Sequence, residues 1–270
     1  TGTRDYYEAK VNNRYQWIGI DDAPRTYILS VHGPFKEKNM GLGGAVFSDV
    51  TGPTSRTGAY LSYAYHLKLT QDLKLSMGIS GGVLQFKIDG TKINLREDGD
   101  PALTEGVQSV VTPDATFGLH LFHEKWYFGL SAPQLIGQNL KFFEAQDPIL
   151  SRLARHYMAM GGYRFDIGDD FSIEPSFLVK YVAPVPVQVD IGAKFAYRDI
   201  VWLGGAYRTN DAISAVLGLT INKYLSIGYS YDFTTSNLQN YSEGTHEIMI
   251  AARFKSLKKP VEAPVEEMEV

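Results

Sequence analysis

Apolar residues alternate with polar or small ones along most of this 270-residue sequence, and this period of two restricts its fold most. In GTHEIMIAARF (residues 244–254), Ile250 and Phe254 fall on one face of a strand, whereas Glu247 and Arg253 fall on the other. The same alternation runs through LKLSMGISGG, FSIEPSFLVKY, VQVDIGAKFAY and LSIGYSYDF. A helix would repeat every 3.6 residues, so these segments are predicted to be strands with one apolar and one polar face.

About fourteen strand-like segments follow one another, and their connections alternate in character. Short polar turns such as KEKN, TQD, HEK and GDD alternate with connections that are longer or richer in Gly and Pro, such as DVTGPTS and VAPVP. Neighbouring strands therefore run up and down, with the short turns at one end. This pattern predicts an all-β fold, an antiparallel transmembrane β-barrel of outer-membrane type with about fourteen strands and both termini periplasmic.

In such a barrel the apolar face contacts lipid and the charged face lines the lumen. An open sheet would leave backbone groups unpaired in hydrocarbon, so closure is required. Aromatic residues should form girdles at both interfaces. We expect Tyr65, Trp126, Phe128, Tyr197 and Phe254 near the short-turn ends, and Tyr7, Trp17, Tyr229, Tyr231 and Phe233 at or towards the other strand ends. A soluble β-sandwich or propeller is disfavoured, because it would bury polar residues and the sequence has no regular repeat.

Composition excludes several classes of function. A net charge of -4 and a pI near 5.9 argue against nucleic-acid partners, which usually require a basic surface. Without cysteine there are no disulfides, thiolate metal sites or Cys nucleophiles. No H-E-x-x-H motif occurs either, and the G-x-S-x-G match GISGG (residues 78–82) lies inside an alternating strand segment rather than between a strand and a helix. The sequence therefore predicts no catalytic residues, no metal site and no cofactor.

Two regions differ in character along the chain. Residues 1–254 are predicted to form the barrel. Residues 255–270, KSLKKPVEAPVEEMEV, contain Pro260 and Pro264, begin basic and end acidic, and lack strand or helix periodicity. We expect a flexible periplasmic tail, which is either an inert solvated extension or a segment that docks a periplasmic partner.

The predicted lumen face collects side chains of both charges. They either pair with one another and order the interior, or line a path for a small solute. The residues assigned to this candidate lumen-facing cluster are Arg14, His66, Glu174, Lys180, Gln188, Asp190, Lys194, Asp232, Glu247 and Arg253.

Several ordered motifs carry a resemblance to a known family. They are RYQWIGIDDAPRTYILSVHGP (residues 14–34), NMGLGGAVFSDVTGP (39–53), YLSYAYHLKL (60–69), EPSFLVKY (174–181), WLGGAYRTNDA (202–212), GYSYDF (228–233) and YSEGTHEI (241–248). With these motifs the sequence resembles the PorP/SprF family of outer-membrane proteins, linked to type IX secretion and gliding motility in Bacteroidetes.

The resemblance implies a non-catalytic outer-membrane barrel that helps to secrete or anchor surface proteins such as adhesins. Its implied partners are outer-membrane lipid, a secreted adhesin or type IX translocon subunits, and an OmpA-like periplasmic protein. The residues themselves leave an alternative open, which is a channel or transporter for a small solute through the charged lumen.

Overall fold

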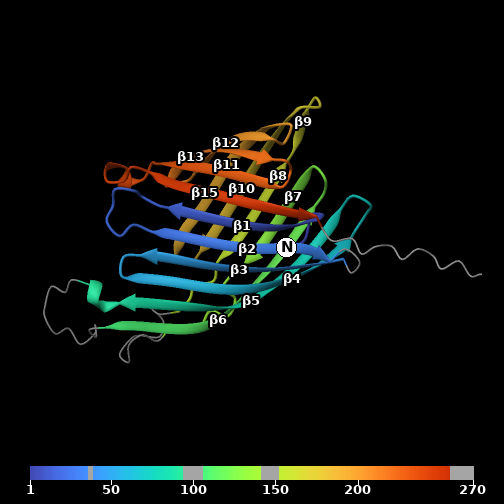
Figure 1. Cartoon of the computed structure of the whole chain (residues 1–270). Coiled ribbons are helices and arrows are strands. Elements are labelled where there is room, and N and C mark those ends of the chain that lie inside the picture. The colour runs from blue at the N-terminus through green and yellow to red at the C-terminus, as the bar shows by residue number, and fades with distance from the viewer. Residues whose placement is uncertain (36–38, 94–105, 141–151, 256–270) are drawn as a thin grey trace, which may run out of the picture.

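The computed structural model describes residues 1–35, 39–93, 106–140 and 152–255 (Figure 1). Its strands are β1 Tyr6–Tyr15, β2 Arg25–Phe35, β3 Met40–Thr51, β4 Thr54–Lys68, β5 Lys74–Asp89, β6 Val107–Phe122, β7 Trp126–Ala132, β8 Tyr157–Tyr163, β9 Phe165–Ile167, β10 Phe171–Val182, β11 Val185–Tyr197, β12 Val201–Arg208, β13 Ala212–Ile221, β14 Leu225–Thr234 and β15 Thr245–Lys255. Two short 3-10 helices, η2 Gly90–Lys92 and η3 Asn237–Asn240, lie in connections. Within the described ranges, no helix is long and apolar enough to cross a membrane.

The strands form one closed antiparallel sheet. Apart from β8 and β9, each strand pairs with its sequence neighbours, and β1 also pairs with β15, so that Tyr6 lies opposite Lys255. β8 and β9 act as one strand along β10, because Gly162 pairs with Ser176 and Phe165 with Ile173 in an unbroken register. Counting β8 and β9 together, the wall has fourteen strands, which confirms the predicted barrel (Figure 1).

The two ends of the barrel carry different connections. The short-turn end holds the polar turns that follow β4, β6, β9, β11 and β13, and Phe35, Tyr6 and Lys255 lie at this end as well. The opposite end, called the loop end, holds the described segments 16–24, 90–93, 133–140, 152–156 and 235–244. That the short-turn end faces the periplasm remains a prediction. β15 extends the wall to Lys255, and the rest of the predicted tail lies outside the described residues.

Three loop-end connections are as short as the turns at the other end. β3 and β4 are joined by Gly52 and Pro53 alone, β10 and β11 by Ala183 and Pro184, and β12 and β13 by residues 209–211. Gly52 has a φ of 53°, which glycine adopts without steric cost, so the hairpin closes in two residues. The Gly and Pro content of these connections therefore predicted correctly at which end of the barrel they lie, but it did not predict their length.

Alternation separates the two faces of the wall as predicted. On β15, Ile250 is 46% exposed on the outer surface, whereas Ala251 is 2% exposed on the lumen side. Outward aromatic rings contact one another at both ends, with Tyr163–Phe165 centroids 4.5 Å apart at the short-turn end. Tyr231 and Phe233 lie 4.6 Å apart at the loop end. These rings are the interfacial girdles that a membrane barrel requires.

One predicted girdle residue was assigned to the wrong end. Tyr7 pairs with Phe254 at the short-turn end, because β1 begins there and runs towards the loop end. Its ring covers Gly33 of β2, where an added Cβ would collide with the Tyr7 side chain. The aromatic ring thus fills the gap that the glycine leaves on the outer wall.

Candidate functional site

A ladder of alternating charges runs along the lumen wall near the loop end. Arg14 of β1 donates to Asp232 of β14 at 2.8 Å and to Glu247 of β15 at 3.1 Å. Arg208 of β12 contacts the same Asp232 oxygen at 3.3 Å and Asp190 of β11 at 3.3 Å. The ladder links strands on both sides of the β1–β15 closure.

The ladder continues onto β10 through Lys180. Its ammonium donates to Asp190 at 3.1 Å and to Gln188 at 3.3 Å. Asn12 of β1 adds a hydrogen bond of 2.8 Å to Glu247 at the other end of the ladder. Paired charges of both signs satisfy one another here, which makes the ladder a structural brace of the wall.

Asp232 is the most buried member of the ladder, with 3% of its surface exposed. A carboxylate so far removed from water is stable only with strong partners. The guanidinium groups of Arg14 and Arg208 approach the same oxygen from two sides. We therefore expect Asp232 to be the residue on which the ladder depends most.

Two further ion pairs, which include predicted lumen residues, lie nearer the short-turn end. Lys194 of β11 contacts Glu174 of β10 at 2.9 Å, and Arg253 of β15 contacts Glu8 of β1 at 3.1 Å. The Lys194 side chain is 45% exposed, so this pair is largely hydrated. Solvent screening leaves such a pair little weight in stability.

The lumen side of β3–β6 is packed with side chains instead. Phe47 and Tyr60 stack with their centroids 6.2 Å apart, and Leu84 is 1% exposed beside them. Tyr60 donates a hydrogen bond of 2.7 Å to Asp114, which is 3% exposed. Gly58 makes room for this layer, because an added Cβ there would meet the Leu84 side chain at 2.8 Å.

The first residues of the chain also lie against the lumen wall. Gly2 has a φ of 70°, and an added Cβ there would lie 2.5 Å from the Cα of Gly41 on β3. The predicted lumen residue His66 lies on this side of the barrel, far from the ladder in the fold, with its ring edge-on to Phe122 at 6.4 Å.

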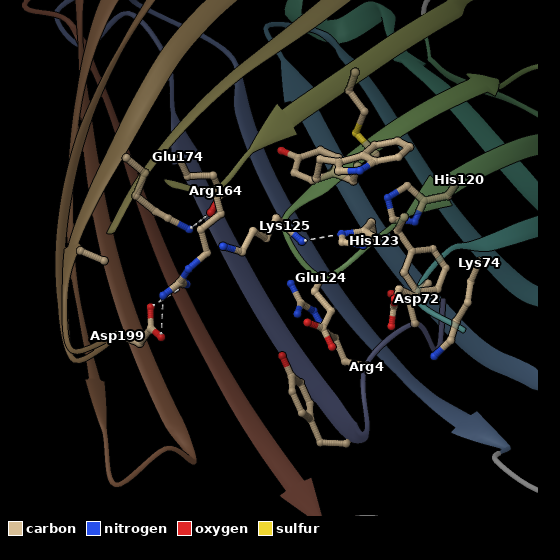
Figure 2. A pocket seen from close by; sticks show the side chains of 18 of the residues that line it. Arg4, Asp72, Lys74, His120, His123, Glu124, Lys125, Arg164, Glu174 and Asp199 are labelled. Atoms are coloured by element: carbon tan, nitrogen blue, oxygen red, sulfur yellow. Dashed lines mark hydrogen bonds and ion pairs between the residues drawn. The ribbon is translucent and has the colours of Figure 1, made fainter. Parts of the chain in front are cut away.

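A cavity of about 890 Å³ opens at the short-turn end of the lumen (Figure 2). It is lined by the first residues of the chain, the β6–β7 turn and several strand ends. Its charged lining includes Arg4, Lys74, Glu124, Arg164, Glu174 and Lys194. Figure 2 shows Glu124 and Lys125 between the Arg164–Glu174 side of the cavity and the Asp72–Lys74 side. Charges of both signs thus face one water-accessible space.

Ion pairs between turns hold the rim of this cavity. Arg164 donates to Asp199 at 3.0 Å and to Asp166 at 2.8 Å, which joins the β11–β12 turn to β9. In the adjacent turns, Arg198 donates to Asp170 at 2.7 Å. This hydrogen bond lowers the pKa of Asp170 below its ordinary value.

The structure thus separates the predicted lumen cluster into three groups. Six of its residues form the ladder, namely Arg14, Lys180, Gln188, Asp190, Asp232 and Glu247. Glu174, Lys194 and Arg253 line the cavity, and His66 faces the lumen on β4. The sequence analysis did not include Arg208. Arg208 and Trp202 are separated by an even number of residues on β12, so both side chains point to the same face, and alternation would have placed Arg208 in the lumen. Arg4 was missed because it precedes the first strand and follows no alternation.

Comparison with protein families shows to which family this barrel belongs. The family described as "Type IX secretion system membrane protein PorP/SprF" matches residues 1–252. The chain belongs to the PorP/SprF family. The match covers nearly the whole barrel, so the fold and the family assignment concern the same residues. No curated protein sequence matches the chain.

Solved structures place this PorP/SprF barrel among outer-membrane proteins. The Ralstonia pickettii toluene transporter TbuX aligns with a TM-score of 0.57 at 10% identity, over 93% of this chain and 89% of that one. The Acinetobacter baumannii outer membrane protein Omp33 aligns with 0.52 at 9%, over 95% and 100%. A Pseudomonas aeruginosa FadL homologue gives 0.51 at 10%, over 93% and 88%. At these identities the likeness concerns the fold, and with the family it establishes an outer-membrane protein.

The lumen of this family member offers ion pairs and a polar cavity. Among the residues that the structure describes, no group of three or more His, Asp and Glu side chains could hold a metal ion. The cavity can accept a polar or zwitterionic group by hydrogen bonds and charge, since both signs are present on its walls.

Proposed function

We propose that the barrel is a non-catalytic component of type IX secretion that holds a surface protein, such as an adhesin, or a translocon subunit at the outer membrane. Membership of the family supports the secretion role. The observation that carries the holding role is the interior, in which the charge ladder and the packed layer of Phe47, Tyr60 and Leu84 occupy both sides of the lumen. A braced interior suits a scaffold better than a wide conduit.

In this proposal the two ends of the barrel meet different partners. Outer-membrane barrels usually present their longer loops to the outside and their short turns to the periplasm. The loop end would then contact the exported surface protein. The short-turn end, with its Arg164–Asp199 and Arg198–Asp170 pairs, would contact an OmpA-like periplasmic protein.

The periplasmic contact can be tested by removing residues 256–270, which follow β15. We expect the shortened protein to assemble as a barrel and to retain less of its periplasmic partner in co-purification. Assembly is checked by the heat-modifiable mobility of the folded barrel on gels. Full retention of the partner by an assembled, shortened barrel would discard the docking role of the tail.

A channel for a small solute is the second candidate function. The cavity of about 890 Å³ with Glu174 and Lys194 on its wall favours it. A channel requires ion current through purified barrels in planar bilayers, and Glu174→Gln or Lys194→Gln should change its selectivity. A scaffold predicts no open-pore current from the wild-type protein. A steady current that both substitutions alter would support the channel and weaken the holding role.

A further inference from the structure

Basic and aromatic side chains gather on the outer surface of four neighbouring strands at the loop end. The strands β14, β15, β1 and β2 lie side by side in the wall (Figure 1). Their register aligns one residue of each strand in a row, namely Tyr231, His246, Tyr15 and Arg25. We call these four residues the rim row. They face outward, because each lies an even number of positions from an exposed apolar residue of its own strand, namely Ile227, Ile248, Val11 and Leu29.

The guanidinium group of Arg25 stacks on the aromatic part of the row. Its central carbon lies 5.6 Å from the centroid of the Tyr15 ring, which is a cation–π contact. The Tyr15 hydroxyl lies 3.3 Å from the Tyr27 hydroxyl, so a second tyrosine steadies the ring that carries Arg25. Within the described residues Arg25 forms no ion pair. Its planar set of N–H donors is therefore ordered and available to an anion.

His246 adds a second basic group to the row. Its Nδ1 lies 2.7 Å from the Tyr229 hydroxyl, and its ring is edge-on to Tyr231 with the centroids 5.0 Å apart. When Tyr229 donates to Nδ1, the neutral ring carries its proton on Nε2 and donates from there. The backbones of His246 and Arg25 are two strand spacings apart, about 10 Å, which two side chains can bridge around one phosphate group.

Negative charges lie on the other face of the wall or farther out. Asp232 and Glu247 follow row residues in the sequence but point into the lumen, where both bind Arg14. The carboxylates of residues 16–24 and of Glu243 belong to the connections beyond the strand ends. The carboxylates that neighbour the row in sequence thus lie behind the wall or beyond its edge, and the row itself is basic.

The outer wall next to the row, towards the middle of the barrel, is apolar. Ile248, Val11 and Leu29 are exposed on three neighbouring strands. Acyl chains that lie along these residues bring the headgroup of the same lipid to the level of the rim row. A free ion would meet only the row, whereas a lipid meets the row and the wall together. The continuity of the two surfaces thus favours a lipid, and the charge of the row favours an anionic headgroup.

We propose that the rim row is a binding site for the phosphate headgroup of an anionic lipid in the leaflet at the loop end. Arg25 donates a pair of hydrogen bonds to the phosphate oxygens, a geometry that a guanidinium group matches closely. His246 and the Tyr15 hydroxyl add donors beside it. The inference goes beyond the holding role and does not depend on it, since it concerns the lipid that surrounds the barrel.

The test is native mass spectrometry of the full-length barrel in a neutral detergent, titrated with dioleoyl phosphatidic acid or with dioleoyl phosphatidylcholine. The two lipids share their acyl chains and differ in the headgroup, which is anionic in the first and zwitterionic in the second. We expect the wild type to bind its first phosphatidic acid about tenfold more tightly than phosphatidylcholine.

Arg25→Gln should weaken the binding of phosphatidic acid about fivefold or more and leave the binding of phosphatidylcholine unchanged. The matched control is Lys87→Gln, which also removes a positive charge from the outer surface at the loop end. Lys87 shares its face with the exposed Val83, and its partners on the neighbouring strands are Ser55 and Ser109 rather than tyrosines. This control should bind both lipids as the wild type does.

A second variant does not depend on the folding of Arg25→Gln. Tyr15→Phe with Tyr27→Phe keeps both rings, and with them the cation–π contact, but removes both hydroxyls. It should weaken the binding of phosphatidic acid about twofold to threefold, because one donor to the phosphate is lost. Assembly of every variant is checked by the heat-modifiable mobility of the folded barrel on gels.

Three results would overturn the proposal. A wild-type barrel that binds the two lipids equally has no headgroup site. Equal weakening by Arg25→Gln and Lys87→Gln would show that any outward basic residue attracts the lipid, and where Arg25→Gln does not assemble, unchanged binding by the double tyrosine variant refutes the site. Complete displacement of phosphatidic acid by an equal concentration of inorganic phosphate would show that the apolar wall contributes nothing, which refutes a lipid as the ligand.

Discussion

Replacing Asp232 with alanine tests whether the charge ladder braces the barrel. The Asp232 side chain is 5% exposed and accepts from Arg14 at 2.8 Å and from Arg208 at 3.3 Å. Each charge-assisted hydrogen bond contributes about 1.5–3 kcal/mol, and an uncompensated charge left behind adds a desolvation cost. Arg14 keeps Glu247 and Arg208 keeps Asp190 after the change, which offsets part of the loss. We expect Asp232→Ala to lower the free energy of unfolding by about 2–4 kcal/mol.

Glu174→Ala is the matched control for this experiment. It also removes one lumen carboxylate, but the partner, Lys194, is 45% exposed. A hydrated pair of this kind contributes at most about 1 kcal/mol. Both variants are unfolded with urea in detergent micelles, with tryptophan fluorescence as the signal, since the chain has 3 tryptophans. Equal losses in the two variants would refute the claim that the ladder is a structural brace.

Two other pairs of substitutions test which face of the wall contacts lipid and whether residues 1–5 pack against the lumen wall. Ile250→Lys places a charge on the lipid-facing surface and should lower the free energy of unfolding by about 2–4 kcal/mol. Met249→Lys, on the lumen side, should lower it much less. Equal folding yields of the two variants in lipid vesicles would contradict the assigned faces. Gly41→Val should displace residues 1–5 from the lumen wall, because its Cβ would lie 2.8 Å from the Gly2 Cα. Gly81→Val is the control, because no atom lies within 4 Å of a Cβ at that position. Protease cleavage before β1 should rise only in the Gly41 variant, and equal cleavage in both would contradict the seating.

Alternation alone predicted which face each residue occupies. Ile250 and Glu247 lie where the period of two placed them, because successive side chains of a strand point to opposite faces whatever the neighbours are. The closed barrel of fourteen strands followed from the count of segments and the alternation of their turns. The face of each residue and the strand count depend on local sequence, so they can be predicted from one amino-acid sequence.

The contacts inside the lumen depend on register, which local sequence does not determine. Arg14 meets Asp232 only because β1 closes on β15 with Tyr6 opposite Lys255. A shift of two residues would keep every face and change every pair.

The most direct test of the central claim is a mild-detergent affinity purification of the protein from native outer membranes, with the co-purifying chains identified and quantified by mass spectrometry. A barrel that holds secretion partners predicts a large secreted surface protein or type IX translocon subunits in near-stoichiometric amounts. A barrel that purifies alone, and conducts a steady current in planar bilayers, would contradict the holding role and identify the lumen as a solute channel.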